Sequence, residues 1–182
     1  GVRGRSVARG YWRRPELPRA AFAEEGFYRL GDAVAWVDAA DPRKGLVFDG
    51  RVAEDFKLAT GTWVSVGPLR AKFIAAAAPF VQDVVIAGLN RNWIGALVFP
   101  RLDECRALAP DLAAAAPAAA VLAHPAVRGR FQALVDAFAR EATGSSTRIA
   151  RAILLDVPPS IDANEITDKG SINQRAVLKA RA

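Results

Sequence analysis

Two apolar runs, at residues 83–88 and 94–99, constrain the fold of this chain more than any other feature of its sequence. Glycine, asparagine and proline residues bound these runs. A short apolar run between turn-forming residues is typical of a strand that is buried on both faces. We therefore predict that both runs are strands of a small mixed sheet, and that helices flank this sheet.

The remaining segments predict an α+β fold in which strands and helices follow one another in mixed order. Aromatic, β-branched or apolar segments predict further strands at 27–38, 46–48, 55–58, 62–66 and 153–157. Helices are predicted at 67–81, 102–108, 125–141 and 172–181. The alanine- and proline-rich residues 109–120 predict a loose helix or a connector, and residues 1–25 are expected to be irregular. The strands at 27–38 and 46–48 are expected to form a β-hairpin ahead of the sheet.

The composition argues against several classes of function. With 52% hydrophobic residues, the chain is expected to bury an ordinary core. The net charge of +6 suits phosphate-bearing partners, but the basic residues are scattered, which disfavours a nucleic-acid binder. The single cysteine, Cys105, excludes an internal disulfide and is expected to be a buried or half-buried thiol. The single histidine, His124, has no partner constellation, so we predict neither a catalytic triad nor a metal site.

The sequence predicts no association with a membrane. It contains no apolar run of about eighteen residues, and its basic start lacks the apolar core of a signal peptide. We therefore expect a cytoplasmic protein. The sequence begins without a methionine, which leads us to expect a fragment of a longer protein.

Asp32 and Arg51 are the first candidate site residues. A carboxylate can accept hydrogen bonds from both hydroxyls of a ribose, and an arginine can donate to the same sugar oxygens. If adjacent strands bring the two together, they form a plausible ribose-binding pair. The alternative is an ordinary ion pair at a domain edge, and spacing alone does not decide between them.

Lys169 is the second candidate, because it lies between Asp168 and Gly170 in a polar loop. An ammonium group on such a loop can reach an acyl or phosphate oxygen and stabilise charge that develops in a transition state. The alternative is a solvated surface lysine, which is the commoner situation for charged side chains.

The order and spacing of several motifs resemble the closing part of the adenylate-forming superfamily, which includes acyl-CoA synthetases, luciferases and the adenylation domains of peptide synthetases. These motifs lie at 28–32, 50–51, 57–61, 158–159 and 165–170. In its detailed sequence the chain most resembles the feruloyl-CoA synthase subfamily. The segments that carry this resemblance are 50–58, 61–67, 81–86, 143–148 and 165–175.

The resemblance implies a ligase that works in two steps. ATP and a carboxylic acid give an acyl-adenylate and pyrophosphate, and the thiol of CoA then displaces AMP. By this resemblance Asp32 and Arg51 bind the ribose, and Lys169 bridges the carboxylate and the α-phosphate during adenylation. Lys57 acts in the second step, and Gly61 and Trp63 line the path of the CoA pantetheine arm. Mg²⁺ is expected only because the ATP chemistry of this superfamily uses it.

The resemblance also implies a division into two domains. Residues 1–50 correspond to the end of a large AMP-binding domain, and residues 51–182 correspond to a C-terminal lid domain. The lid rotates between the two steps about a hinge, for which Glu54 and Asp55 are the candidates. The partners implied are therefore the large N-terminal domain, which supplies the phosphate loop and the acyl pocket, and a small carboxylic acid. The fragment alone is expected to be inactive.

Two alternatives remain open from the sequence. The acid is expected to be ferulate or a related hydroxycinnamate, but the ligase could instead act on another aryl acid or on a fatty acid. A non-catalytic interaction module that retains the lid fold is the second alternative, because a fold does not by itself fix a function.

Overall fold

The computed structural model describes residues 1–8, 10–14, 21–23 and 25–181. It divides the chain into two compact units, which we call unit 1 (Gly1–Ala53) and unit 2 (Glu54–Ala182). The predicted α+β fold is confirmed, because small sheets and flanking helices make up the chain. Among the described residues, no helix has both the length and the apolar character needed to cross a bilayer.

Unit 1 is built around the hairpin of β1 (Asp32–Trp36) and β2 (Leu46–Arg51), which pair antiparallel. The strand predicted at 27–38 is shorter, because Tyr28 pairs with Val2 and Phe22 in isolated bridges instead of continuing the hairpin. Many large apolar side chains of the unit are exposed, among them Trp12, Val34, Trp36, Leu46 and Phe48. The described residues of unit 1 therefore bury little apolar surface and form no hydrophobic core cluster.

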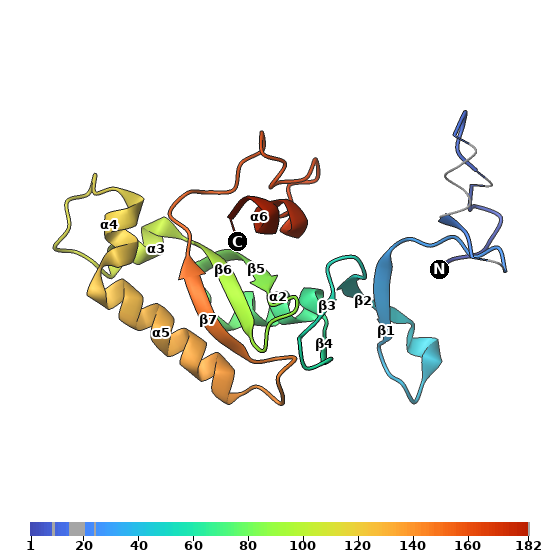
Figure 1. Cartoon of the computed structure of the whole chain (residues 1–182), viewed down its shortest axis with the longest axis horizontal. Coiled ribbons are helices and arrows are strands. Elements are labelled where there is room, and N and C mark those ends of the chain that lie inside the picture. Colours follow the sequence, from blue (N-terminus) through green and yellow to red (C-terminus); the bar gives the residue numbers. More distant parts are fainter. Residues whose placement is uncertain (9, 15–20, 24, 182) are drawn as a thin grey trace. The chain divides into compact units, whose positions relative to one another are not determined.

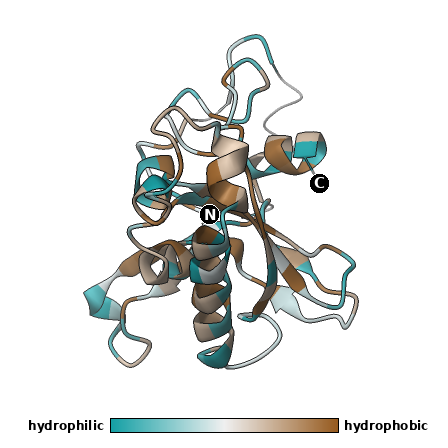
Figure 2. Cartoon of the chain, turned by 90° about the vertical axis from the view of Figure 1, so that its left-hand side faces the viewer, coloured by the Kyte–Doolittle hydropathy of each residue, from teal (hydrophilic) through white to brown (hydrophobic). Residues whose placement is uncertain are grey.

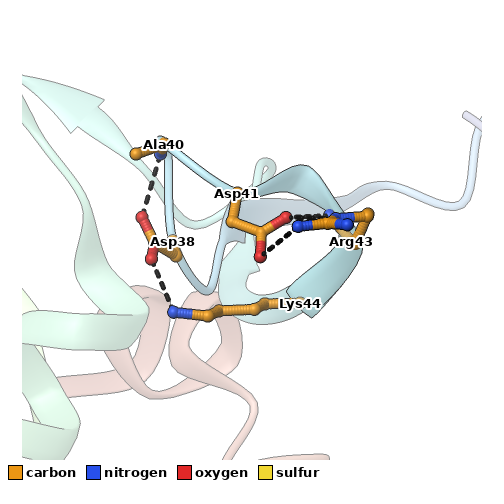
Figure 3. Close-up of polar contacts among 5 residues, drawn as sticks. All are labelled: Asp38, Ala40, Asp41, Arg43 and Lys44. Carbon is orange, nitrogen blue, oxygen red and sulfur yellow. Dashed lines mark hydrogen bonds and ion pairs between the residues drawn. The ribbon is translucent and has the colours of Figure 1, made fainter.

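The turn between β1 and β2 is closed by its own charged residues and contains the 3-10 helix η1 (Pro42–Lys44). Figure 3 shows that Asp38 accepts hydrogen bonds from the Ala40 N–H (2.9 Å) and the Lys44 ammonium (2.7 Å), while Asp41 accepts one from Arg43 Nε (2.8 Å). These donors lower the pKa of both carboxyls, chiefly through Lys44 for Asp38 and Arg43 for Asp41. These contacts are local to residues 38–45. They stabilise the turn that the Asp, Pro and Gly residues of this segment predict.

Unit 2 begins with a second hairpin, β3 (Phe56–Lys57) and β4 (Trp63–Val64), and continues into a three-stranded mixed sheet (Figure 1). Its central strand, β6 (Ile94–Pro100), pairs antiparallel with β5 (Val81–Ala87) and parallel with β7 (Ile149–Leu154). The helices are α2 (Val66–Ala76), α3 (Leu102–Ala107), α4 (Ala118–Ala123), α5 (Pro125–Arg140) and α6 (Gln174–Arg181).

Alternate residues of the sheet enter two separate cores, because successive side chains of a strand point to opposite faces. On one face Val84 of β5 and Ile94 of β6 pack with Phe73 of α2 and Phe138 of α5, whose rings meet edge to face. On the other face the smaller core contains Val85, Leu97, Phe99 and Val177 of α6. Figure 2 shows hydrophobic and hydrophilic residues mixed along the helices, as expected where each helix covers the sheet with one side only. Both predicted apolar strands are confirmed as buried.

Three predicted boundaries were wrong. The helix predicted at 67–81 ends at Ala76, because Pro79 lacks the N–H that a helix needs and disfavours helical backbone at the residue before it. Val81 instead begins β5, paired with Pro100. The strand predicted at 153–157 lies four residues earlier, at Ile149–Leu154, since pairing with β6 decides its position. The strand predicted at 46–48 continues to Arg51 in β2. Residues 109–120, predicted as a loose helix or a connector, contain the start of α4 in agreement with that prediction.

Cys105 and His124, the single cysteine and the single histidine of the chain, both occupy structural positions in unit 2. Cys105 of α3 is fully buried, and this burial, with a smaller effect of Glu104, raises the pKa of its thiol to about 11. His124 precedes α5, where its ring nitrogen accepts a hydrogen bond from the Ala126 N–H (3.3 Å). The Cys105 prediction is confirmed, and His124 caps a helix.

Candidate functional site

Asp32 and Arg51 face each other across β1 and β2 of unit 1, where they are register partners. Arg51 Nη1 lies 2.8 Å from Asp32 Oδ1, which is an ion-pair distance. That oxygen is nevertheless buried and accepts no hydrogen bond of good geometry from any residue that the structure describes. The contact is therefore an ion pair without hydrogen-bond geometry, and the Asp32 side chain as a whole keeps 28% of its surface exposed.

The two hinge candidates lie at the start of unit 2. Asp55 Oδ1 accepts a hydrogen bond of 2.9 Å from the backbone N–H of Val66, the first residue of α2. Ser65, the residue in the N-cap position, makes no such bond with its own side chain. Asp55 therefore substitutes as the acceptor at the N-terminus of α2.

We expect Asp55→Ala to lower the free energy of unfolding of unit 2 by about 1 kcal/mol, which is typical for loss of a helix-capping acceptor. Urea unfolding followed by circular dichroism measures this change. The exposed Asp162 provides a control, because Asp162→Ala should leave the midpoint unchanged. If Asp55→Ala unfolds at the same urea concentration as the wild type, the capping role of Asp55 is wrong.

Lys57 and Trp63 form one cross-strand pair of the β3–β4 hairpin. The Lys57 ammonium lies 5.9 Å from the centroid of the Trp63 ring, and the Trp63 side chain is 49% exposed. Gly61, in the turn between the strands, has φ +83°, and a Cβ built on it would meet no atom within 4 Å. The hairpin therefore presents a cation, an aromatic ring and an open glycine on its surface.

Two neighbouring segments hold this hairpin against the sheet. The backbone N–H of Ala59 donates to the carbonyl of Arg91 (2.9 Å), and the N–H of Asn90 donates to the carbonyl of Lys57 (3.2 Å). Ser145 Oγ lies 3.4 Å from Thr62 Oγ1, so the segment before β7 also reaches the hairpin. Sequence reasoning did not predict these contacts, although the motif 143–148 was singled out.

Lys169 lies at the tip of a small hairpin that is closed by a tight turn. The Gly170 N–H donates to the carbonyl of Thr167 (2.9 Å), and the Thr167 N–H donates to the carbonyl of Ser171 (2.8 Å). The side-chain hydroxyls of Thr167 and Ser171 are also hydrogen-bonded (2.8 Å). The Lys169 side chain is exposed, and no described residue forms an ion pair with it.

A buried ion pair lies at the base of this hairpin. Glu165 is 1% exposed, and both of its oxygens accept hydrogen bonds from Arg181 of α6, Oε1 from Nε (2.7 Å) and Oε2 from Nη2 (2.5 Å). Arg181 lowers the pKa of Glu165, and Glu165 raises the pKa of Arg181, mainly through these hydrogen bonds. Sequence reasoning missed Arg181, which is sixteen positions away and carries no local signal.

The two lysine-bearing hairpins occupy different parts of the surface of unit 2. In Figure 1 the loop 160–171 lies at the top of the unit, beside α6, and the β3–β4 hairpin lies below it, beyond the end of the sheet. Among the described residues, no group of three or more His, Cys, Asp or Glu side chains could hold a metal ion.

The comparison with known protein families identifies the domain. Residues 56–181 match the family described as AMP-binding enzyme C-terminal domain. The chain belongs to this family. The matched range covers most of unit 2, including both lysine-bearing hairpins.

Relatives of this C-terminal domain include two curated enzymes. The chain is 28% identical, over 118 residues, to a chloroplastic long-chain-fatty-acid–[acyl-carrier-protein] ligase of Arabidopsis thaliana, covering 60% of the chain and 16% of that protein. It is 26% identical, over 181 residues, to a carboxylic acid reductase of Segniliparus rugosus, covering 99% of the chain and 14% of that protein. The chain thus spans about a sixth or less of the length of these relatives.

A solved structure supports the fold over nearly the whole chain. The A-PCP didomain of the Segniliparus rugosus carboxylic acid reductase, in complex with AMP, superposes with a TM-score of 0.69 at 25% identity. The match covers 98% of the chain and 22% of the didomain, so it includes the hairpin β1–β2 as well as the C-terminal domain. The homologues of this C-terminal domain are adenylate-forming enzymes that act on carboxylic acids.

Proposed function

We propose that the chain is part of an ATP-dependent ligase that joins a carboxylic acid to CoA through an acyl-adenylate. The observation that carries this proposal is the placement of Lys57 and Lys169 on two hairpins at different parts of one compact unit. A rigid unit cannot present both surfaces to one reaction centre at the same time. Rotation of unit 2 about a hinge at Glu54 and Asp55 would present Lys169 for the first step and Lys57 for the second.

In the adenylation step a carboxylate oxygen of the acid attacks the α-phosphorus of ATP, and the bond to pyrophosphate breaks. Negative charge accumulates on the phosphoryl oxygens, and the exposed ammonium of Lys169 offsets it while holding the two reactants together. Asp32 and Arg51 bind the ribose hydroxyls of the nucleotide. The pairing of Asp32 with Arg51 across β1 and β2, and the part of the Asp32 side chain that stays exposed, support this role.

In the second step the thiolate of CoA attacks the acyl carbon, and the bond between that carbon and the AMP oxygen breaks. The β3–β4 hairpin suits a thiol substrate that arrives on a long flexible arm. Gly61 has open space where other residues carry a side chain, and the half-exposed Trp63 ring offers an apolar surface beside it. The Lys57 ammonium lies 5.9 Å from the centroid of that ring, and we assign it the role of offsetting negative charge on the leaving AMP.

We propose that the acid is ferulate or a related hydroxycinnamate. This proposal is supported by the resemblance of segments 50–58, 143–148 and 165–175 to the feruloyl-CoA synthase subfamily. The test uses the whole protein that carries this chain, supplied with ATP, Mg²⁺, CoA and one acid at a time. We expect ferulate and coumarate to drive AMP release with a higher kcat/KM than benzoate or a medium-chain fatty acid.

A fatty acid preference would contradict the hydroxycinnamate assignment and retain the ligase. It would agree with the activity of the Arabidopsis relative, which is a long-chain-fatty-acid–[acyl-carrier-protein] ligase. Failure of every acid to drive AMP release would instead favour an interaction module that has kept the fold of the C-terminal domain.

A further inference from the structure

The base of the Lys169 hairpin contains the buried ion pair Glu165–Arg181. The turn itself is closed by hydrogen bonds among Thr167, Gly170 and Ser171, so the ion pair is not needed to form it. We propose that Glu165 is a positioning residue for adenylation, which acts through Arg181 to fix the direction in which the hairpin presents Lys169. This inference rests on the proposed role of Lys169 in the first step, and it adds a residue that lies away from the reacting atoms.

The carboxylate of Glu165 is fully provided with donors. Besides the two bonds from Arg181, its Oε2 accepts a hydrogen bond of 2.7 Å from the backbone N–H of Ser160. Arg181 in turn donates to the carbonyl oxygens of Val157 (2.6 Å) and Pro158 (2.9 Å). One ion pair thereby joins the segment that leaves β7, the base of the hairpin and the end of α6.

Backbone hydrogen bonds fix the hairpin on the same anchor. The Glu165 N–H donates to the carbonyl of Ser160 (2.9 Å), and the carbonyl of Glu165 accepts from the Asn173 N–H (2.8 Å). Ile166 and Ile172 then pair as an antiparallel bridge. Only five residues lie between the two partners of this bridge, and Lys169 is the middle one, so the orientation of Glu165 sets the orientation of the tip.

The neighbouring helix is itself fixed to the sheet. Gln174, the first residue of α6, is buried, and its Oε1 accepts a hydrogen bond of 3.2 Å from the backbone N–H of Ile86 in β5. At the other end of α6 the Arg181 guanidinium lies over the Phe99 ring of β6, with 5.3 Å to its centroid. The ion pair therefore connects the hairpin to a rigid part of unit 2.

An ion pair at this place is not needed for stability alone. Burying two charges costs solvation free energy, and well-packed apolar residues of similar size often stabilise a protein equally well. A bidentate carboxylate–guanidinium contact, however, fixes distance and angle together. Because no described residue forms an ion pair with the Lys169 side chain, its position depends on the hairpin beneath it. A misplacement of about 1 Å in a catalytic group can cost about 100-fold in rate.

The test compares the two half-reactions in variants of the whole protein. Glu165→Gln keeps the shape of the side chain and removes the charge that holds Arg181. We expect it to lower kcat for acid-dependent ATP–pyrophosphate exchange by about 10-fold or more, with the KM for the acid changed less than kcat. The rate at which preformed acyl-adenylate is converted by CoA should stay within about twofold of wild type. Arg181→Lys should give the same division, because lysine cannot replace the fork of the guanidinium.

Asp83→Asn is the matched control, because Arg70 and Asp83 form a bidentate pair of the same kind between α2 and β5 (2.8 and 2.6 Å). It breaks an ion pair of unit 2 without touching the lysine hairpin. If Glu165→Gln acts only by destabilising unit 2, it should slow both half-reactions to the same extent, and Asp83→Asn should do the same. Trypsin gives a second readout, since release of the hairpin should speed cleavage after Lys169 in Glu165→Gln but not in Asp83→Asn.

Each outcome decides the inference. Normal exchange activity in Glu165→Gln, or an equal loss in both half-reactions that Asp83→Asn reproduces, would overturn it. If Glu165→Gln does not yield folded protein, Arg181→Lys supplies the same comparison. Lys169→Ala, assayed in parallel, separates the two levels: full exchange activity in that variant would refute the proposed function, whereas loss in Lys169→Ala with none in Glu165→Gln would refute only the positioning role.

Discussion

Lys169→Ala is expected to reduce the rate of adenylation by about 100-fold to 1,000-fold, as removal of one preorganised donor to a developing oxyanion does in other enzymes. The exposed tip position means that the loss follows from chemistry rather than unfolding, because the hydrogen bonds that close the turn come from Thr167, Gly170 and Ser171. ATP–pyrophosphate exchange with the preferred acid measures the first step. Conversion of preformed acyl-adenylate by CoA measures the second, and we expect it to be nearly unchanged.

Lys179→Ala provides the matched control for charge. Lys179 is also exposed and lies in the last turn of α6, but it has no place in the proposed site. Both half-reactions should continue at wild-type rates in this variant. Equal activity of Lys169→Ala and Lys179→Ala in the exchange assay would mean that Lys169 is an ordinary surface lysine.

Gly61→Leu is expected to give the opposite result, with adenylation retained and the CoA-dependent step slowed by about 100-fold. Leucine would fill the open space that Gly61 leaves for the pantetheine arm. The positive φ of +83° adds strain of about 1–2 kcal/mol for any residue with a Cβ, so the variant is also expected to be somewhat less stable. Single-turnover transfer from acyl-adenylate to CoA measures the step directly.

The strain has its own control in Gly45, which has a similar φ of +85° and equally open surroundings. Gly45→Leu should be strained as well, but Gly45 follows η1 in the β1–β2 turn and has no proposed contact with CoA. If both leucine variants slow transfer to the same extent, strain explains the loss, and the proposed path of the pantetheine arm is refuted.

The fold was predictable where local pattern and burial agree. The run at 94–99 is apolar because β6 is the central strand and is covered on both faces, so its sequence alone identified it. β7 is an edge strand with the exposed residues Arg151 and Ile153. Because its first half contains the polar residue Arg151, the apolar pattern predicted a strand only from residue 153. Its true limits depend on register with β6, which no short segment of sequence encodes.

The candidate site divides in a similar way. The positions of Asp32, Arg51, Lys57 and Lys169 could be inferred because each belongs to a short motif whose spacing is recognisable. The Glu165–Arg181 pair could not, because the contact is made only after α6 has packed on the sheet. The same holds for Asp55, whose capping contact with Val66 forms only once the β3–β4 hairpin has returned the chain to the start of α2.

The burial of Cys105 offers a practical route to watching the proposed rotation. With a pKa of about 11 and no exposed surface, this thiol should react very slowly with maleimide dyes at neutral pH. It is also the single cysteine of these 182 residues. A cysteine introduced at an exposed position of unit 2, such as Asp162, would therefore take a fluorophore alone within this chain. Energy transfer from it to a second dye on the large domain would report when the lid turns.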